Sequence, residues 1–125
     1  MENWYHGSPL ELTVLREGST ITKERDLARI FSHKPSLVTL DDRAGKILSI
    51  KHNGTLPGFL YCIAEEVGAE DAKPHPRSSM PPGFEWLTQR DLHLRLLEPT
   101  SPRPEEQLSE SEIQELYERA RQANL

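Results

Sequence analysis

The 125-residue chain is poor in cysteine, and this excludes two kinds of cross-link. Cys62 is the only cysteine, so the chain has no internal disulfide and no cluster of thiolates that would bind a metal. Cys62 lies in the apolar run Phe59 to Ala64, where a cysteine is typical of a small buried hydrophobic residue.

Aromatic residues and long hydrophobic runs are also scarce. Aromatic side chains make up 6% of the sequence and hydrophobic residues 35%, while there are ten prolines. This composition predicts one loop-rich domain with short strands. No run is long enough to span a membrane, and the first residues lack a basic segment followed by an apolar one. We therefore expect a cytoplasmic protein that does not contact membranes.

The chain has no excess of positive charge. Its formal charge is −5, and from Arg103 onward six glutamates face three arginines. Because non-specific binding to nucleic acid relies on Lys and Arg, this balance makes a nucleic-acid partner unlikely.

The elements that the pattern does predict are short. A helix should follow Thr22 as its N-cap, with the apolar stripe Leu27, Ala28, Ile30 and Phe31, and should stop at Lys34-Pro35. Residues 36–40 and 46–50 read as paired strands around a turn at 41–45. The uninterrupted apolar run 59–64 predicts a central strand.

The rest of the chain is less regular. Four prolines in residues 65–84 predict a long loop without regular structure, and residues 85–88 and 92–96 read as late strands. A proline-rich linker at 100–108 and a capping box at Ser109 and Glu112 precede an amphipathic C-terminal helix over 109–125. The predicted class is α+β and dominated by strands, with one short helix and a C-terminal helix.

The segment Trp4-Tyr5-His6-Gly7-Ser8 carries the chemistry that stands out most. Its aromatic residues favour a strand, a histidine ring can bind a sugar hydroxyl, and a glycine lets a flat ligand approach the backbone. The pattern resembles the first signature of the ADP-ribosyltransferase superfamily, Tyr-His-Gly-Thr/Ser, which binds the nicotinamide side of NAD. Thr20 to Ala28 and Glu85 to Thr88 resemble the second and third segments, and Phe59 to Tyr61 resembles the central strand.

This resemblance covers about residues 4–98 and implies a split sheet in an ADP-ribosyltransferase-like domain over residues 1–99. It implies that His6, Gly7 and Ser8 bind NAD and that Glu85 is the catalytic carboxylate, with His6 beside it. A carboxylate near the ribose would stabilise the oxocarbenium ion formed when the nicotinamide bond breaks. The alternatives are a histidine bound to a local carbonyl and an ordinary glutamate at a strand start.

The chain departs from the family at Thr20, where an aromatic residue usually stacks on nicotinamide. Either Tyr5, Tyr61 or Trp86 substitutes for this aromatic residue, or NAD binding is weakened or lost. Trp86 itself is more typical of a packed core. Arg25 and Arg29, one helical turn apart, could face the pyrophosphate; the alternative is a pair of solvated surface charges.

The expected function is mono-ADP-ribosyl transfer from NAD to an unknown acceptor, or NAD hydrolysis, by a monomer or weak homodimer. The alternative is a module that keeps the fold without activity and binds a nucleotide or a protein. The histidines show no metal-ligand spacing, so no metal site is predicted.

Overall fold

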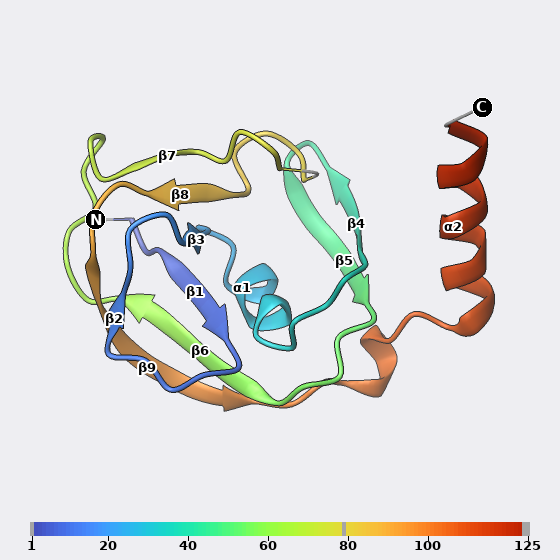
Figure 1. Ribbon diagram of the computed structural model, residues 1–125, viewed down its shortest axis with the longest axis horizontal. Coiled ribbons are helices and arrows are strands. Elements are labelled where there is room, and N and C mark those ends of the chain that lie inside the picture. Colours follow the sequence, from blue (N-terminus) through green and yellow to red (C-terminus); the bar gives the residue numbers. More distant parts are fainter. Residues whose placement is uncertain (1, 79, 124–125) are drawn as a thin grey trace.

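The computed structural model describes residues 2–78 and 80–123, and within them the chain is strand-rich with two α-helices (Figure 1). The α+β class predicted from the sequence is therefore confirmed. Over the same residues, neither helix has the length and apolar character needed to cross a membrane.

The largest sheet has four antiparallel strands in the order β1-β6-β9-β2. Their bounds are Tyr5–Ser8 for β1, Gly58–Ile63 for β6, Leu92–Thr100 for β9 and Val14–Leu15 for β2. The apolar strand β6 is paired on both edges and its residues are mostly buried, which confirms the prediction of a central strand.

A smaller sheet contains β3 (Thr20–Ile21), β8 (Trp86–Thr88) and β7 (Ala72–Pro74) in that order. It meets the first sheet through a single bridge, in which Tyr5 and Thr22 exchange two backbone hydrogen bonds of 2.8 and 3.0 Å. Beyond this bridge the strands β1 and β3 pair with different partners.

The prediction that residues 65–84 have no regular structure is wrong, because this segment contains β7. Pro74 is compatible with pairing since β7 is an edge strand, where one side of the backbone needs no partner. Arg90 further anchors the segment through ion pairs of 2.6 Å to Glu65 and 2.8 Å to Asp71.

The helix α1 spans Arg25–Phe31 and lies between the four-stranded sheet and the hairpin formed by β4 (Val38–Arg43) and β5 (Lys46–His52) (Figure 1). The sequence predicted Thr22 as the N-cap of α1, and this prediction is wrong. Glu24 occupies that position, and the Thr22 hydroxyl accepts the Glu24 N–H at 3.0 Å, which fixes the turn before the helix. The buried positions Leu27, Ala28 and Ile30 confirm the predicted apolar stripe.

The predicted pair of strands after α1 forms a longer hairpin than expected, with β4 at Val38–Arg43 and β5 at Lys46–His52. The turn is therefore only Ala44-Gly45 and not 41–45. Both turn residues have positive φ, 54° and 80°, which matches the twist of a tight hairpin.

Two apolar clusters make up the core. One joins the small sheet to the start of the chain, and the other packs α1 against the hairpin. The first contains Trp4, Leu15, Ile21 and Ala72, and the second contains Leu27, Ile30, Ile50 and Phe84.

The packed body of the protein extends beyond residue 99, into the segment that the sequence predicts to be a linker. Strand β9 extends through Pro99 and Thr100, a 3₁₀ helix η1 spans Pro104–Glu106, and Leu108 is buried. Residues 100–108 thus pack against the body of the protein.

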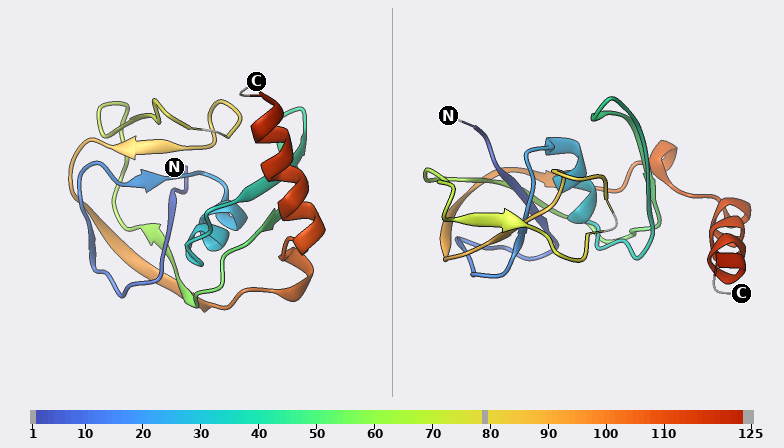
Figure 2. Two further views of the ribbon diagram at one scale, coloured as in Figure 1. Left: turned by 45° about the vertical axis from the view of Figure 1, so that its right-hand side comes forward. Right: turned by 90° about the horizontal axis from the view of Figure 1, so that it is seen from above.

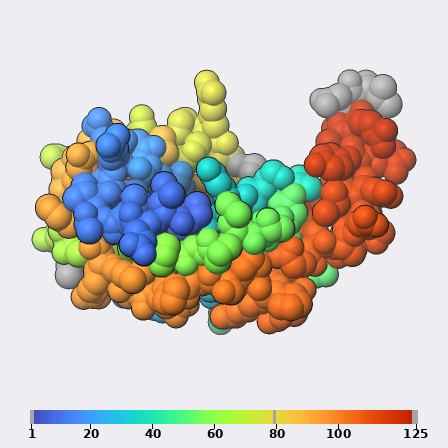
Figure 3. Space-filling model, turned by 60° about the horizontal axis from the view of Figure 1, so that its bottom comes forward, coloured from blue at the N-terminus to red at the C-terminus, as the bar shows by residue number. Residues whose placement is uncertain are grey.

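The helix α2 (Glu110–Ala123) has the predicted capping box, with reciprocal hydrogen bonds of 3.0 and 3.1 Å between Ser109 and Glu112. None of its residues is buried. Two further orientations and the space-filling view show it standing away from the body (Figure 2, Figure 3).

Candidate functional site

A cavity of about 220 Å³ lies where the two sheets part, next to α1. Four of the residues selected from the sequence line it, namely His6, Gly7, Thr20 and Glu85. Its other lining residues are Tyr5, Thr22, Ala28 and Phe31. Segments far apart in the sequence therefore converge on one pocket.

His6 is held by the edge of the second sheet. Its Nδ1–H donates to the Thr20 carbonyl at 2.7 Å, an assignment that follows from the carbonyl being only an acceptor. Burial lowers the pKa of His6, and the bond to Thr20 opposes this only in part. At neutral pH the ring is therefore uncharged, and Nε2 is an acceptor. His6 therefore binds a nearby carbonyl, as the alternative interpretation predicts, and it also lines the cavity.

Glu85 forms another part of the wall and is half-buried. Its carboxylate Oε1 accepts a hydrogen bond of 2.8 Å from the Ser78 hydroxyl, and its carbonyl accepts the His75 N–H at 3.0 Å. Glu85 is thus tied to the proline-rich loop that precedes it. Sequence reasoning missed Ser78, because nothing in the local pattern marks a contact made across this loop.

Gly7 is required for a different reason from the one expected. A Cβ atom at this position would lie 1.8 Å from the carbonyl oxygen of Ala28 and 2.8 Å from the Ser32 nitrogen. The missing side chain allows α1 to pack directly on β1. The backbone of Gly7 still lines the cavity, but the close approach that needs a glycine is to the helix and not to a ligand.

Ser8 and Tyr61 lie outside the residues that line the cavity. The Ser8 hydroxyl accepts the Leu10 N–H at 3.1 Å and so stabilises the turn after β1. Tyr61 is only 2% exposed, and its hydroxyl donates to the Leu10 carbonyl and accepts the Leu12 N–H. The expectation that Tyr61 stacks on a cofactor is therefore wrong.

The aromatic rings in the cavity are those of Tyr5 and Phe31. Tyr5 was among the substitutes considered for an aromatic at position 20. Phe31 was assigned only to the apolar stripe of α1, and its place at the helix end brings it to the cavity. Trp86 packs edge-to-face on Trp4, with ring centroids 5.5 Å apart, as the core interpretation predicts.

Arg25 and Arg29 face a second, wider groove between α1, the β4–β5 hairpin and η1. Arg25 is half-exposed, pairs with Glu98 at 3.7 Å and lies 5.9 Å from the ring centroid of Tyr5. Arg29 is buried and pairs with Glu106 and Asp26. Arg29 is therefore not a solvated surface charge, and it does not line the cavity.

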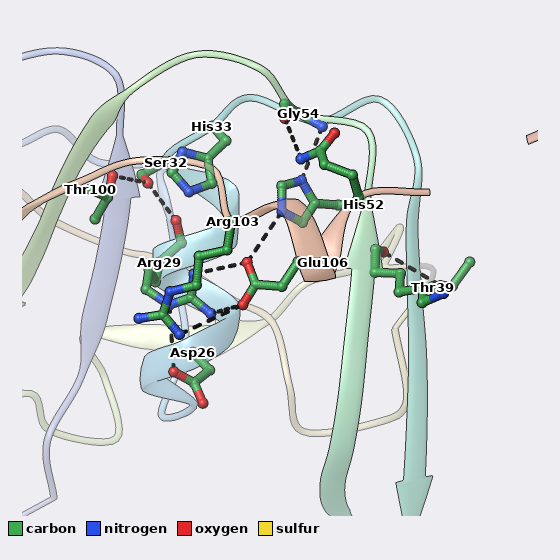
Figure 4. Close-up of polar contacts among 12 residues, drawn as sticks. Asp26, Arg29, Ser32, His33, Thr39, His52, Gly54, Thr100, Arg103 and Glu106 are labelled. Carbon is green, nitrogen blue, oxygen red and sulfur yellow. Dashed lines mark hydrogen bonds and ion pairs between the residues drawn. The ribbon is translucent and has the colours of Figure 1, made fainter. Parts of the chain in front are cut away.

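Arg29 belongs to a buried polar cluster that also contains His33, His52 and Glu106 (Figure 4). The two imidazole rings stack with centroids 5.5 Å apart. His33 donates from Nδ1 to the Leu56 carbonyl at 2.7 Å, whereas Nδ1 of His52 accepts the Gly54 N–H at 3.0 Å. Burial lowers the pKa of both rings, and for His52 the neighbouring His33 lowers it further.

The Nε2 atoms of His33 and His52 are buried without a hydrogen bond, although Nε2 of His52 lies 3.6 Å from the Glu106 carboxylate. Among residues 2–78 and 80–123, no group of three His, Cys, Asp or Glu side chains could hold a metal ion. The cluster connects η1 to α1 and β5 through the contacts of Glu106 with Arg29 and His52.

A scan against known protein families found no match, and neither did searches of characterised proteins and of solved structures.

Proposed function

We propose that the cavity binds the nicotinamide-ribose end of NAD and that the protein is an ADP-ribosyltransferase-like enzyme. The observation that supports this is the convergence of His6, Thr20 and Glu85 on one cavity. These residues come from the three segments that resemble the superfamily, and they are 14 and 65 positions apart in the sequence (6 to 20 and 20 to 85).

The size of the cavity fits part of the dinucleotide. At about 220 Å³ it is smaller than the roughly 300–1,000 Å³ of a site that encloses a whole drug-sized ligand. One end of NAD would therefore enter it, and the diphosphate and adenosine would lie outside. The neutral Nε2 of His6 is suited to accept a hydrogen bond from a ribose hydroxyl.

Tyr5 and Phe31 would supply the aromatic faces that Thr20 lacks. A pyridinium ring carries a positive charge, and the face of an aromatic ring attracts a cation in addition to the apolar surface that it buries. Phe31 lies on the last turn of α1 and Tyr5 at the start of β1, so the two rings reach the cavity from different elements.

Glu85 would carry the chemistry. When the bond between nicotinamide and ribose breaks, positive charge develops on the ribose ring, and a fixed carboxylate stabilises that charge. The hydrogen bond from Ser78 holds the carboxylate at the cavity wall before substrate arrives. The same carboxylate can accept a proton from the group that attacks the ribose.

The test combines a binding measurement with an activity measurement. Titrating ¹⁵N-labelled protein with NAD should shift the amide signals of Gly7, Thr20 and Glu85 together. Nicotinamide release should fall about 100-fold or more in Glu85→Gln, which keeps the shape of the side chain but removes its charge. Glu70→Gln is the matched control, because Glu70 is exposed and outside the cavity.

Two outcomes would contradict the proposal in different ways. Localised amide shifts without nicotinamide release would favour the alternative, a module that binds a nucleotide without turning it over. No shifts at millimolar NAD, or full release by Glu85→Gln, would overturn the roles of the cavity and of Glu85.

A further inference from the structure

Ser78 brings a hydroxyl group next to the carboxylate of Glu85. The hydroxyl donates to Oε1 of Glu85 at 2.8 Å and accepts the N–H of Met80 at 3.1 Å. These two bonds fix the direction in which the hydroxyl proton points. A hydroxyl oxygen held 2.8 Å from a carboxylate oxygen has the geometry that general-base catalysis requires.

The loop that carries Ser78 is also bonded to the backbone of Glu85, and a further hydrogen bond forms within the loop. The N–H of His75 donates to the Glu85 carbonyl at 3.0 Å, and the N–H of Arg77 donates to Nδ1 of His75 at 3.0 Å. The hydroxyl therefore stays near Glu85 without help from a second molecule. Such proximity raises the rate of a reaction because no encounter has to occur.

We propose that Ser78 is an acceptor of ADP-ribose in its own molecule, with Glu85 as the base. The inference rests on the function proposed above and extends it by naming the acceptor as a hydroxyl group. Hydrogen bonding to Glu85 alone would make Ser78 a positioning residue, and the experiment below separates these two roles.

The reaction balances without a further reagent. The bond between C1′ of the ribose and the nicotinamide nitrogen breaks, and its electron pair leaves with nicotinamide, which becomes neutral. The Ser78 oxygen forms the new bond to C1′. Its proton passes to the Glu85 carboxylate and then to solvent. The products are nicotinamide, one proton and a chain that carries one ADP-ribose on Ser78.

The experiment incubates the full chain with NAD and follows two quantities in the same sample, released nicotinamide and the intact mass of the protein. Fragmentation that preserves the sugar linkage locates the adduct. We expect a single ADP-ribose on Ser78, formed with a rate constant that does not depend on protein concentration. Ser78→Thr, which keeps a hydroxyl, should still form the adduct.

Ser78→Ala tests whether the adduct lies on Ser78. We expect this variant to lose the adduct and to release nicotinamide more slowly than the wild type, because Glu85 loses the hydrogen bond that holds it and water replaces the serine as acceptor. Ser101→Ala is the matched control, since Ser101 is exposed and does not line the cavity, and this variant should form the adduct as the wild type does.

Three results would overturn the inference. Nicotinamide release with no adduct on Ser78 would leave the proposed function intact and remove this acceptor. An adduct that persists in Ser78→Ala would lie on another residue and would show that Ser78 only positions Glu85. No release and no NAD binding by the wild-type protein would overturn the proposed function, and this inference with it.

Discussion

Arg29 on α1 and Glu106 on η1 form an ion pair that is largely withdrawn from solvent. Their side chains are 7% and 14% exposed, and both terminal nitrogens of the guanidinium donate to the two carboxylate oxygens. Burial alone would raise the pKa of Glu106, but the bonds from Arg29 more than offset this, so the pKa lies below its ordinary value. Residues 77 positions apart are thereby joined.

Removing the charge of Glu106 should therefore destabilise the protein strongly. Glu106→Gln leaves the buried Arg29 without its main partner, which costs about 3–5 kcal/mol in comparable buried pairs. The free energy of unfolding in urea measures this loss. Glu105→Gln, at the exposed neighbouring position, should change it by less than about 0.5 kcal/mol. Equal effects of the two substitutions would contradict the importance of the pair.

Stability should also depend on pH through the buried histidines. The pKa values of His6, His33 and His52 are lowered from 6.5 by burial, so between the folded value and 6.5 the unfolded chain binds more protons. The contribution of these histidines to the free energy of unfolding should be largest above pH 6.5 and should be lost as the pH decreases below 6.5. The slope approaches about 1.4 kcal/mol per pH unit for each histidine.

Urea unfolding at a series of pH values between 8 and 5 would measure this slope. His52→Gln removes the contribution of one proton and should reduce the slope by up to about 1.4 kcal/mol per pH unit. Nuclear magnetic resonance of the histidine rings gives an independent check, because the rings of His6, His33 and His52 should titrate below pH 6.5. A constant free energy of unfolding from pH 7 to 5 would contradict the prediction. Glu106 should lose its contribution to the free energy of unfolding only at a lower pH, below 4.5, because its pKa in the folded protein lies below this ordinary value.

Local signals in the sequence predicted several elements of the fold. The apolar run at 59–64 indicated the central strand β6, and the spacing of Ser109 and Glu112 indicated the start of α2, because each depends on neighbouring residues. The packing of residues 100–108 could not be predicted. It depends on the pairing of Arg29 with Glu106, and no local pattern specifies a contact over that distance.

The candidate site was predictable to a similar extent. His6 and Glu85 were selected through the resemblance to a family, and they line the same cavity. Phe31 and Ser78 were not selected, since a phenylalanine in an apolar stripe and a serine in a loop are common. Gly7 was selected for access to a ligand, whereas its contact with the Ala28 carbonyl depends on how α1 lies over β1.

Gly7→Ala should destabilise the protein by about 3 kcal/mol or more. The added methyl group would lie 1.8 Å from the carbonyl oxygen of Ala28, so the helix must move away from β1. Gly68→Ala is a suitable control, because its Cβ would meet only the side chain of Asp71 at 3.3 Å. Thermal unfolding compares the two variants. A stable Gly7→Ala would show that α1 and β1 can separate freely.

Truncation at two points separates the contribution of α2 from that of the segment before it. Deleting residues 109–125 removes the helix α2, which has no buried residue and which, among the described residues, is joined to the rest of the chain by one ion pair, between Lys51 and Glu112. The free energy of unfolding should therefore fall by less than about 1 kcal/mol. Deleting residues 101–125 also removes Glu106 and the buried Leu108, and the loss should be about 4 kcal/mol or more.

Urea unfolding measures both values, and sedimentation of the two truncated chains reports whether either deletion changes self-association. A large loss from the shorter deletion would mean that α2 packs on the body in solution, in contrast to its position in Figure 2.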